Sequence, residues 1–546
     1  MTINRSWIFV VLLLAAVTAL YGQFLWNPIV FDDVYFFIID NEGKQPVSSY
    51  HWSLLELRSL PYATIAWTAK LLGLDLINFR VEALLLHAVV GVALFFFVLQ
   101  LYRQVPALGV NGEQKLPVIW LAFFAALLFV LHPVAVYGAG YLIQRTIVMA
   151  TLFSLLAMQA YLHGSVRHQP LWLWASVPLY YLAVFCKEHA IMLPAVLLAL
   201  TMLLHEDWRA KLKQRWGIFA VFAAIALFVL LARKGVLGSV YEINAPEMLE
   251  QIDGGAHSYM LSILTQSALF FKYLALWLVP NPAWMSVDMR EPFAQGVFSV
   301  YGLALLAYFL YGLLAIRLLF KRGRAGLIGF ALLFPWLMFM TEFTTVRVQE
   351  SFVLYRSYLW MAGLLVIVPL LFLKMRARPA LAALSLISVL MMLLAWDRLT
   401  TFSHPLLLWD DAAKLVEGRP YLPGMERIYH NRGISLSKTR LKQEAIADYT
   451  TAIRMRPNYG YVYNDRGVMY LELQRYAEAM NDFETAIRIK PDYSLPYIGR
   501  GVVLKKFGRQ EEARQSFGTA CVLGYQSACA ELNRPGVTEK MEPIFH

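Results

Sequence analysis

Long apolar runs recur from the start of this 546-residue sequence to about residue 400. The first covers residues 7–25 and the last covers residues 379–396, and each approaches the ~20 residues with which an α-helix crosses the hydrocarbon core of a bilayer. Hydrophobic residues make up 59% of the chain, which excludes an ordinary soluble domain. The sequence therefore predicts a polytopic bundle of membrane helices.

The distribution of basic residues predicts how the chain crosses. Most of the net charge of +11 falls in short loops between apolar runs, where it sets orientation and does not indicate nucleic-acid binding. Arg5 precedes the first run, so we expect a cytoplasmic N-terminus, and no small-residue cleavage site follows that run. With the basic loops in the cytoplasm, eleven runs cross the membrane. Two weaker runs contain a lysine and are predicted not to cross: 57–74 lies on the outer surface, and 259–280 is an interfacial or half-inserted helix on the outer side.

The outer side then receives nearly every polar residue that is placed at a membrane boundary. Its loops are residues 26–80, 132–142, 187–189, 233–296 and 342–356. The cytoplasmic loops contain basic residues of the kind that anchor helix ends. An active site in this unit is therefore expected to face outward.

The C-terminal part of the sequence is polar and repeats every 34 residues. Arg-Gly pairs, small residues and aromatic residues recur at fixed offsets, namely Arg432-Gly433, Arg466-Gly467 and Arg500-Gly501, Ala445, Ala479 and Ala513, and Tyr449, Phe483 and Phe517. This spacing is typical of tetratricopeptide repeats, which form an α-solenoid. The predicted fold is all-α, with a bundle over 1–400, a linker over 401–424, three repeats over 425–535 and a tail over 536–546.

Two cysteines in the third repeat are placed to meet. A turn at Gly524 folds Cys521 back toward Cys529 on the next helix, which predicts a disulfide. The alternative is a pair of small buried residues with free thiols. A disulfide requires an oxidising compartment, in agreement with a tail outside the cytoplasm.

Several short motifs in the apolar part share their order with a known enzyme family. They are Phe31-Asp32-Asp33, the segment 58–87, His132-Pro133-Val134 with Gln144-Arg145, Lys187-Glu188, and Arg356-Ser357-Tyr358-Leu359 with Glu350 upstream. With the repeats, they resemble the transmembrane-and-tetratricopeptide-repeat O-mannosyltransferases and their bacterial relatives. The sequence departs from that pattern at Glu82, Tyr137 and Thr146, so mannose is not carried over as the sugar.

The resemblance implies a glycosyltransferase of the GT-C class. Such an enzyme transfers a sugar from a polyprenyl-phosphate carrier to an acceptor on the outer face of the membrane, which is the periplasmic face in a bacterium. The localisation expected here is the bacterial inner membrane, with the N-terminus in the cytoplasm and the repeats in the periplasm.

Adjacent carboxylates follow the first apolar run, where charge is costly to place. Asp33 or Asp32 can serve as general base toward an acceptor hydroxyl, and the other can orient it or bind a divalent cation. No other carboxylates are visibly spaced to complete a metal site. The alternative interpretation is that an aspartate caps the next helix.

Cations are needed to meet the phosphate of the donor. The outer-side candidates are Arg145, Lys187 and Arg356, since arginine binds phosphate in a bidentate manner and lysine acts as a point charge. Each has a plainer alternative, namely a snorkelling lysine at Lys187 and boundary anchors at the two arginines.

Four further side chains are candidates for supporting roles. Glu188 and Glu350 are expected to pair with the cations, because buried charges usually come paired. His132 either supports the site or ends a helix before Pro133, and Tyr137 either lines the sugar site or belongs to an interfacial aromatic belt.

Three functions remain open from the sequence. The first is transfer of a sugar to a protein hydroxyl, with the repeats binding the acceptor, for example a pilin or another surface protein. The second is transfer to a lipid or glycan. The third is a non-enzymatic membrane scaffold for envelope assembly that uses the repeats alone.

Overall fold

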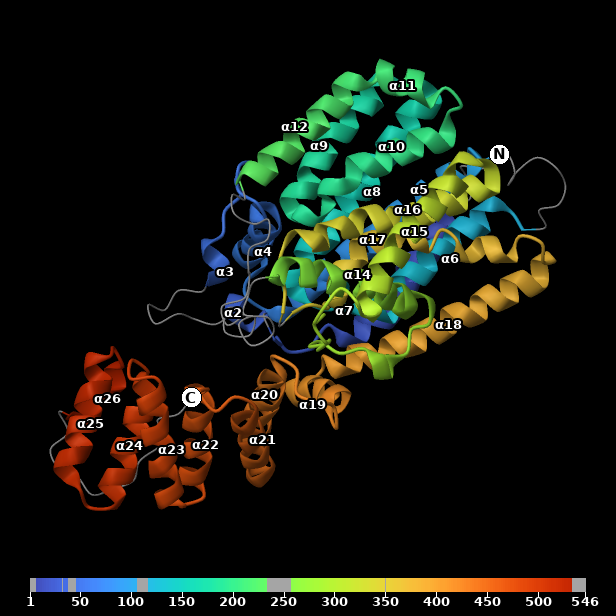
Figure 1. Ribbon diagram of the computed structural model, residues 1–546. Coiled ribbons are helices and arrows are strands. Elements are labelled where there is room, and N and C mark those ends of the chain that lie inside the picture. Colours follow the sequence, from blue (N-terminus) through green and yellow to red (C-terminus); the bar gives the residue numbers. More distant parts are fainter. Residues whose placement is uncertain are drawn as a thin grey trace. The chain divides into compact units, whose positions relative to one another are not determined.

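The computed structural model describes residues 6–31, 33–37, 46–105, 116–232, 257–348 and 350–532, and it separates into two compact units, Met1–Leu408 and Trp409–His546. Within the described residues all regular elements are helices, apart from one isolated bridge between Met289 and Phe352, so the all-α fold class is confirmed (Figure 1). Asp32, part of the 233–296 loop and the predicted tail lie outside the described residues.

The first unit is a bundle in which neighbouring long helices pack side by side. Its α-helices are α1 (Ser6–Tyr21), α2 (Asp33–Phe37), α3 (Pro46–Ser49), α4 (Ser59–Leu72), α5 (Leu76–Arg103), α6 (Val118–Val130), α7 (Val136–Ala139), α8 (Arg145–Arg167), α9 (Pro170–Cys186), α10 (Leu193–Leu204), α11 (Trp208–Gln214), α12 (Trp216–Ala232), α14 (Ser258–Leu278), α15 (Val300–Phe320), α16 (Gly323–Phe339), α17 (Ser357–Leu364) and α18 (Ala377–Thr401). Packing pairs include α8 with α9, α5 with α6, and α15 with α16.

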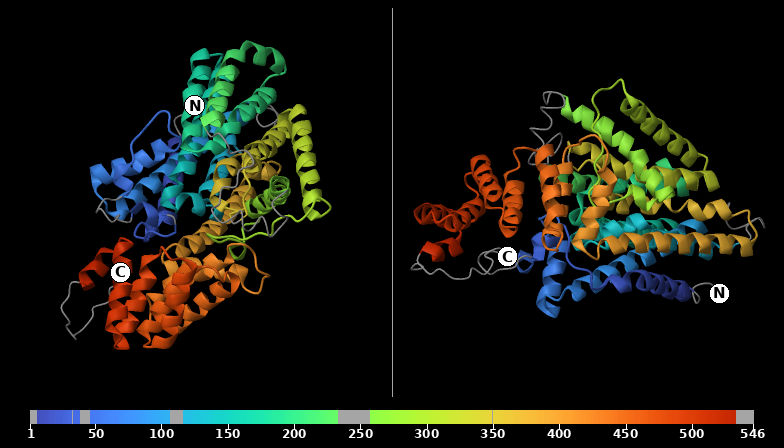
Figure 2. Two further views of the ribbon diagram at one scale, coloured as in Figure 1. Left: turned by 60° about the vertical axis from the view of Figure 1, so that its left-hand side comes forward. Right: turned by 90° about the horizontal axis from the view of Figure 1, so that it is seen from below.

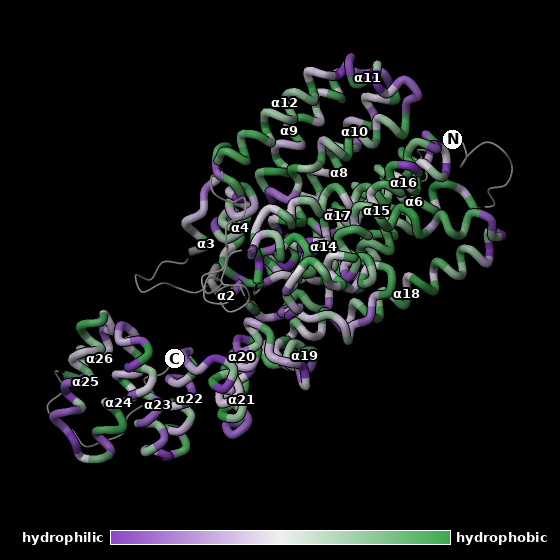
Figure 3. Tube along the Cα trace, viewed as in Figure 1, coloured by the Kyte–Doolittle hydropathy of each residue, from purple (hydrophilic) through white to green (hydrophobic). Residues whose placement is uncertain are grey.

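Apolar side chains cover the outside of this unit as well as its core. On α15 the leucines at 303, 306, 310, 313 and 314 are exposed, and on α18 Val389, Leu390 and Leu393 are exposed. Figure 3 shows the same apolar character along most of the helices of this unit. Apolar faces of this extent are expected where the surrounding medium is hydrocarbon.

Seven helices in the described residues are long and apolar enough to cross a membrane, or nine if two bent pairs are each one span. The run at 259–280 is one of the seven and forms α14, most of which is buried. Length and composition therefore allow α14 to cross, although the charge pattern assigned it to the outer surface. The count of eleven crossings stays a prediction.

The second unit consists of helix pairs stacked in sequence (Figure 2). Its repeat helices are α20 (Met425–Ser437), α21 (Lys442–Met455), α22 (Gly460–Glu472), α23 (Tyr476–Ile489), α24 (Ser494–Lys506), α25 (Gln510–Val522) and α26 (Gln526–Leu532). The predicted linker over 401–424 needs a correction, because residues 405–416 form α19 (Pro405–Val416). Asp410 of α19 accepts a hydrogen bond from Arg432 at 3.2 Å, which ties α19 to the first repeat.

The 34-residue pattern has a direct structural cause. Arg432 and Arg466 each donate two hydrogen bonds to an aspartate 16 residues later, with distances of 2.7 and 2.8 Å to Asp448 and 2.8 Å to Asp482. The glycine after each arginine faces an aromatic ring 16 residues later, and a Cβ atom at Gly467 would lie 2.9 Å from Phe483. The pair of helices can approach closely only without that side chain.

Candidate functional site

Charged side chains gather where α9 ends and α10 has not yet begun. This group, the Lys187 cluster, draws on three distant parts of the first unit. One part is Arg58 ahead of α4, the second is the turn of Lys187, Glu188 and His189, and the third is the segment around the 3₁₀-helices Met340–Thr344 and Leu354–Arg356. Its members are Arg58, Lys187, Glu188, His189, Glu342, Arg347 and Arg356.

Glu342 lies at the centre of the cluster and is almost completely buried. One carboxylate oxygen is 2.9 Å from Nε2 of His189, and the other is 3.2 Å from Arg356 and 3.6 Å from Arg347. Arg356 also donates to the backbone oxygen of Glu350 at 3.4 Å. Glu342 therefore holds two guanidinium groups together, which would otherwise repel each other.

Arg58 pairs with Glu188 across the cluster. The guanidinium donates from Nε to the Glu188 carboxylate at 3.1 Å and makes a second contact from Nη2. Arg58 has a positive φ of 65°, a left-handed conformation that is uncommon for arginine, and its backbone N–H donates to Phe185 at 2.6 Å. Burial raises the pKa of Glu188, but Arg58 and Lys187 outweigh it and hold that pKa well below its usual range.

Lys187 differs from the other cations of the cluster, because its ammonium has neither a hydrogen bond nor an ion pair within the described residues. The residue is 7% exposed, and its Nζ lies 5.8 Å from the ring centroid of Tyr355. Burial and then the charge of Arg58 lower its pKa to about 7. With four basic side chains and the carboxylates of Glu188, Glu342 and Glu350, the last of which acts on Arg356, the cluster has one excess positive charge when Lys187 is protonated and His189 is neutral.

A second polar group surrounds the start of α8. Asp33 is fully buried, and its two carboxylate oxygens accept hydrogen bonds from the backbone N–H groups of Leu142 at 3.1 Å and Ile143 at 2.8 Å. These groups begin the 3₁₀-turn Leu142–Gln144 that leads into α8. Asp33 thus caps the start of a 3₁₀-helix 109 residues away.

Arg145 is the first residue of α8, where a positive charge opposes the helix dipole. Its guanidinium lies 3.0 Å from the carboxylate of Glu82 and donates to Thr64 at 3.1 Å. Its Nε and Nη2 atoms are buried and have no partner in the described part of the chain. Arg145 therefore retains unused donors beside the start of α8.

The structure brings together only some of the residues predicted for the site. Lys187, Glu188 and Arg356 meet in the Lys187 cluster, whereas Asp33 and Arg145 belong to the second group. Helix α4 connects the two groups, because Arg58 of the Lys187 cluster directly precedes it and Thr64, a partner of Arg145, lies within it.

Glu350 reaches the Lys187 cluster through its backbone oxygen, and the two remaining described candidates have plainer surroundings. His132 is buried, its Nδ1 accepts from the N–H of Val134, and its ring stacks on Trp277 with centroids 4.3 Å apart. Its Nε2 lies 3.1 Å from the backbone oxygen of Trp277. These contacts agree with the helix-ending alternative. Tyr137 is buried with its ring 5.8 Å from that of Phe402.

Sequence reasoning missed Glu342, His189, Arg58 and Arg347. Glu342 and His189 lie 153 residues apart, so no local spacing connects them. The available signal was weaker: all four fall in or beside segments that the charge pattern had assigned to the outer side.

Metal binding finds no support in the part of the chain that is described. Those residues contain no group of three or more His, Cys, Asp or Glu side chains arranged to hold an ion. Asp32 is outside them, so a divalent cation at the aspartate pair stays a prediction.

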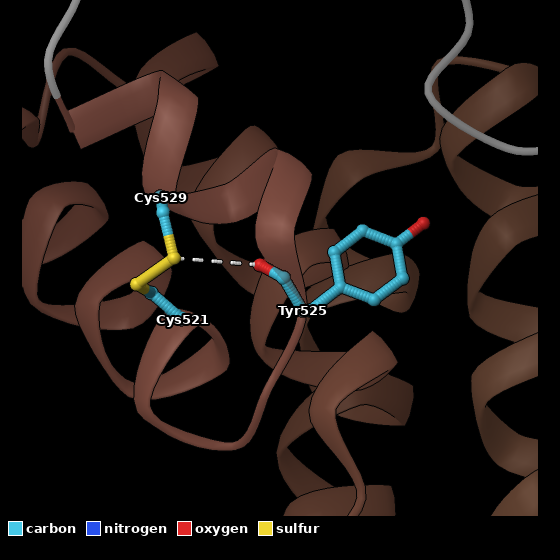
Figure 4. The surroundings of a disulfide bond; sticks show 3 residues. All are labelled: Cys521, Tyr525 and Cys529. Atoms are coloured by element: carbon cyan, nitrogen blue, oxygen red, sulfur yellow. Dashed lines mark hydrogen bonds between the residues drawn. A yellow bond between two sulfur atoms is a disulfide. The ribbon is translucent and has the colours of Figure 1, made fainter. Parts of the chain in front are cut away.

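The C-terminal cysteines are bonded. Cys521 and Cys529 form a disulfide with Cα atoms 4.9 Å apart, and Figure 4 shows it joining the end of α25 to α26. The Cys529 sulfur also lies 3.8 Å from the backbone oxygen of Tyr525. The disulfide therefore holds the last two helices of the array together.

Two family models of the tetratricopeptide repeat match the chain, one over residues 426–459 and one over residues 460–493. The third predicted repeat is present as the helix pair α24 and α25. No curated protein matches the sequence.

Solved structures similar to the chain include three with tetratricopeptide or related helical folds. The second such domain of human RPAP3, in complex with an HSP70 peptide, is 32% identical, with coverage of 20% of this chain and 94% of that one and a TM-score of 0.20. The Arabidopsis OM64 domain is 25% identical, with coverages of 20% and 90% and a TM-score of 0.19. MamA is 20% identical, with coverages of 29% and 90% and a TM-score of 0.21.

Proposed function

Residues 426–493 belong to the tetratricopeptide-repeat family, and from that premise and the Lys187 cluster we propose an integral-membrane glycosyltransferase. The enzyme moves a sugar from a polyprenyl-phosphate donor to a protein hydroxyl on the periplasmic face. It is of the GT-C type, and its repeats bind the acceptor, for example a pilin or another surface protein.

The single observation that carries this proposal is the excess positive charge around Lys187. Burying the Lys187 ammonium costs free energy, and the charge of Glu188 offsets this only in part, because the pKa of Lys187 remains lowered to about 7. An anionic ligand removes that cost, and a phosphate attached to a lipid suits a cationic group beside long apolar helices. Arg356, held by Glu342 at 3.2 Å, supplies a second cation for the same anion.

In the proposed reaction the acceptor oxygen attacks C1 of the sugar while the bond between C1 and the phosphate oxygen breaks. The acceptor proton passes to a carboxylate, and the polyprenyl phosphate leaves with the bonding electron pair. Lys187 and Arg356 stabilise the charge that develops on the leaving phosphate. Arg145, with its unused N–H groups, is available to a second part of the donor.

The two aspartates then have different expected roles. Both oxygens of Asp33 accept backbone N–H bonds, so this carboxylate positions the start of α8 and, through it, Arg145. Asp32, its neighbour in the sequence, is the other candidate for general base. We therefore assign the role of proton acceptor to Asp32 and the positioning role to Asp33.

The repeats and their disulfide fit an acceptor-binding role outside the cytoplasm. Tetratricopeptide arrays bind peptides and proteins on an extended surface. The Cys521–Cys529 bond is of the kind that persists in oxidising compartments such as the periplasm.

A membrane-anchored scaffold is the second candidate. It is favoured by one observation: the repeats are the region that matches known families, and they account for protein binding without chemistry. In that case the charges around Lys187 hold helix ends together and bind no donor.

Mass spectrometry of envelope proteins separates the two candidates. Cells that lack the chain are complemented with the wild type, with the double variant Asp32→Asn/Asp33→Asn, or with a chain that lacks residues 425–546. We expect a sugar mass on at least one envelope protein only with the wild type. Glu56→Gln serves as control, because Glu56 is an exposed carboxylate in the same outer loop.

The outcome decides between enzyme and scaffold. Loss of the modification in the double variant, with normal membrane insertion and normal abundance, supports catalysis. Undiminished glycosylation in that variant excludes the aspartates from the reaction. If no envelope protein changes mass when the chain is absent, transfer to a protein is excluded, and the scaffold or transfer to a lipid or glycan is favoured instead.

A further inference from the structure

A cavity of about 430 Å³ opens at the other end of α8 and α9 from the Lys187 cluster. It lies between the α8–α9 connection and the short helix α11 with the start of α12. Figure 1 shows α9 and α12 side by side, and the two helices are in contact. The side chains that matter for its chemistry are His168, Trp174, Lys211, Gln214, Arg215 and Trp216.

The cavity is basic. Lys211 is half-buried and Arg215 is buried, and no acidic residue belongs to the lining. Arg215 donates to the hydroxyl of Tyr161 at 3.2 Å, and its Nη2 lies 3.5 Å from Nε2 of His205. Neither partner is a carboxylate, and Arg215 forms no ion pair among the described residues. A buried guanidinium without a counter-ion favours an anion in the space beside it.

Apolar surface continues from the cavity along both neighbouring helices. Leu171 and Trp172 near the start of α9 are exposed, and so are Leu227, Phe228 and Leu231 on α12. Trp174 and Trp216 are largely exposed at the cavity itself, in the position that tryptophan takes at a membrane interface. A lipid whose phosphate is bound at Lys211 and Arg215 would therefore find apolar surface for its acyl chains along α9 and α12.

The location fits the opposite face of the membrane. Helix α9 has 17 residues, which at 1.5 Å per residue is about 25 Å, close to the thickness of a hydrocarbon core. The Lys187 cluster follows its last residue and the cavity is lined by its first turns. Lys211 and Arg215, the basic residues of the cavity, lie in a loop that the charge pattern assigns to the cytoplasm.

We propose that this cavity binds the phosphate-bearing headgroup of an anionic phospholipid, with its acyl chains along α9 and α12. Lys211 and Arg215 contact the phosphate, and the two tryptophans lie at the level of the glycerol backbone. The site requires only that the first unit is embedded in a membrane. It is independent of sugar transfer, so an inactive transferase would still bind the lipid.

Native mass spectrometry of the full chain in detergent tests the site. The protein is titrated with palmitoyl-oleoyl phosphatidylglycerol and, separately, with the corresponding phosphatidylcholine. We expect the first phosphatidylglycerol to bind more tightly than phosphatidylcholine. Lys211→Gln should weaken it about tenfold, equivalent to about 1.4 kcal/mol. Lys213→Gln is the matched control, since Lys213 is on the same helix with the same charge but is exposed and outside the lining.

Gly217→Phe provides a second variant that does not remove a charge. Gly217 belongs to the lining, and a Cβ atom there meets no atom within 4 Å, so we expect the backbone to accept a side chain that fills part of the cavity. Binding of the first phosphatidylglycerol should again fall about tenfold, with an unchanged circular dichroism spectrum.

Three results would overturn the proposal. Equal losses in Lys211→Gln and Lys213→Gln would mean that diffuse surface charge attracts the lipid. Equal affinity for both lipids would remove the preference for an anion. Full displacement of the lipid by millimolar inorganic phosphate would assign the cavity to a soluble anion.

Discussion

Basic residues have different partners in the two units, and the difference separates structural charge from candidate functional charge. In the repeats, Arg432 and Arg466 each meet a carboxylate 16 residues later, at the same register. In the first unit, Lys187 lies among three guanidinium groups without an ion-pair partner in the described residues. Paired and periodic charges define a fold, whereas an unpaired buried cation indicates that a ligand completes the site.

The largest expected effect is on the stability of the repeats when a paired charge loses its partner. Asp482→Leu leaves Arg466 without its two hydrogen bonds and should destabilise the second unit by about 3 kcal/mol. Lys187→Met removes an unpaired cation and should leave the first unit equally or more stable. Hydrogen exchange measured by mass spectrometry reports on each unit separately.

The matched control for the paired charge is Glu478→Leu on the same helix. Glu478 forms an exposed ion pair with Arg475, which should contribute little to stability because solvent screens it. A loss in Glu478→Leu as large as that in Asp482→Leu would remove the distinction between paired core charges and surface charges.

The glycines of the repeats provide a test with the same substitution at two sites. A Cβ atom at Gly501 would lie 2.7 Å from Phe517, whereas one at Gly518 meets nothing within 4 Å. Gly501→Ala should therefore destabilise the third repeat by about 1–3 kcal/mol. Gly518→Ala should stabilise its helix by up to about 1 kcal/mol. Urea unfolding monitored by exchange in α24 and α25 checks both, and effects of the same sign would contradict the packing argument.

The disulfide should make a contribution of similar size at the end of the array. Cys521 and Cys529 are eight positions apart, and a loop of this length gives about 2.5 kcal/mol from restriction of the unfolded chain. Faster exchange in α26 is expected for Cys521→Ser/Cys529→Ser. A reductant should have the same effect on the wild type and none on the double variant. Sensitivity of the double variant to reductant would contradict the assignment.

The smallest expected effect is a dependence on pH at Lys187. Burial and Arg58 lower the pKa of its ammonium to about 7. As the pH rises through that value the ammonium loses its proton, so affinity for an anion should fall several-fold between pH 6.5 and about 8.5. Lys187→Arg keeps its charge over this range and should give a flat profile when farnesyl phosphate binding is measured. A wild-type profile that is equally flat would exclude titration of Lys187.

The repeats could be predicted almost completely from the sequence. The Arg-Gly pair, the aspartate and the aromatic residue are fixed to one another by contacts 16 residues apart, so the pattern is local and recurs. The last repeat shows the limit, because Arg500 there meets the hydroxyl of Ser516 at 2.9 Å in place of a carboxylate.

The site in the first unit could be predicted only in part. Lys187, Glu188 and Arg356 were found because they interrupt apolar sequence, and the structure places them in one cluster. Glu342, which holds Arg356, was not found because its partners are brought to it by tertiary packing. Asp33 was expected to act on a substrate or to cap the helix after it, and these roles stay predictions. Its contact with the distant Leu142–Gln144 turn was not expected, because no local pattern encodes it.

Binding of farnesyl phosphate to the purified full-length chain tests the central claim most directly. We expect saturable binding to the wild type at pH 6.5, a loss of at least about tenfold in Lys187→Met, and no change in Lys70→Met, where an exposed lysine of α4 lies outside the Lys187 cluster. Equal binding by the wild type and Lys187→Met, with both proteins folded, would contradict the claim that the Lys187 cluster is a phosphate site.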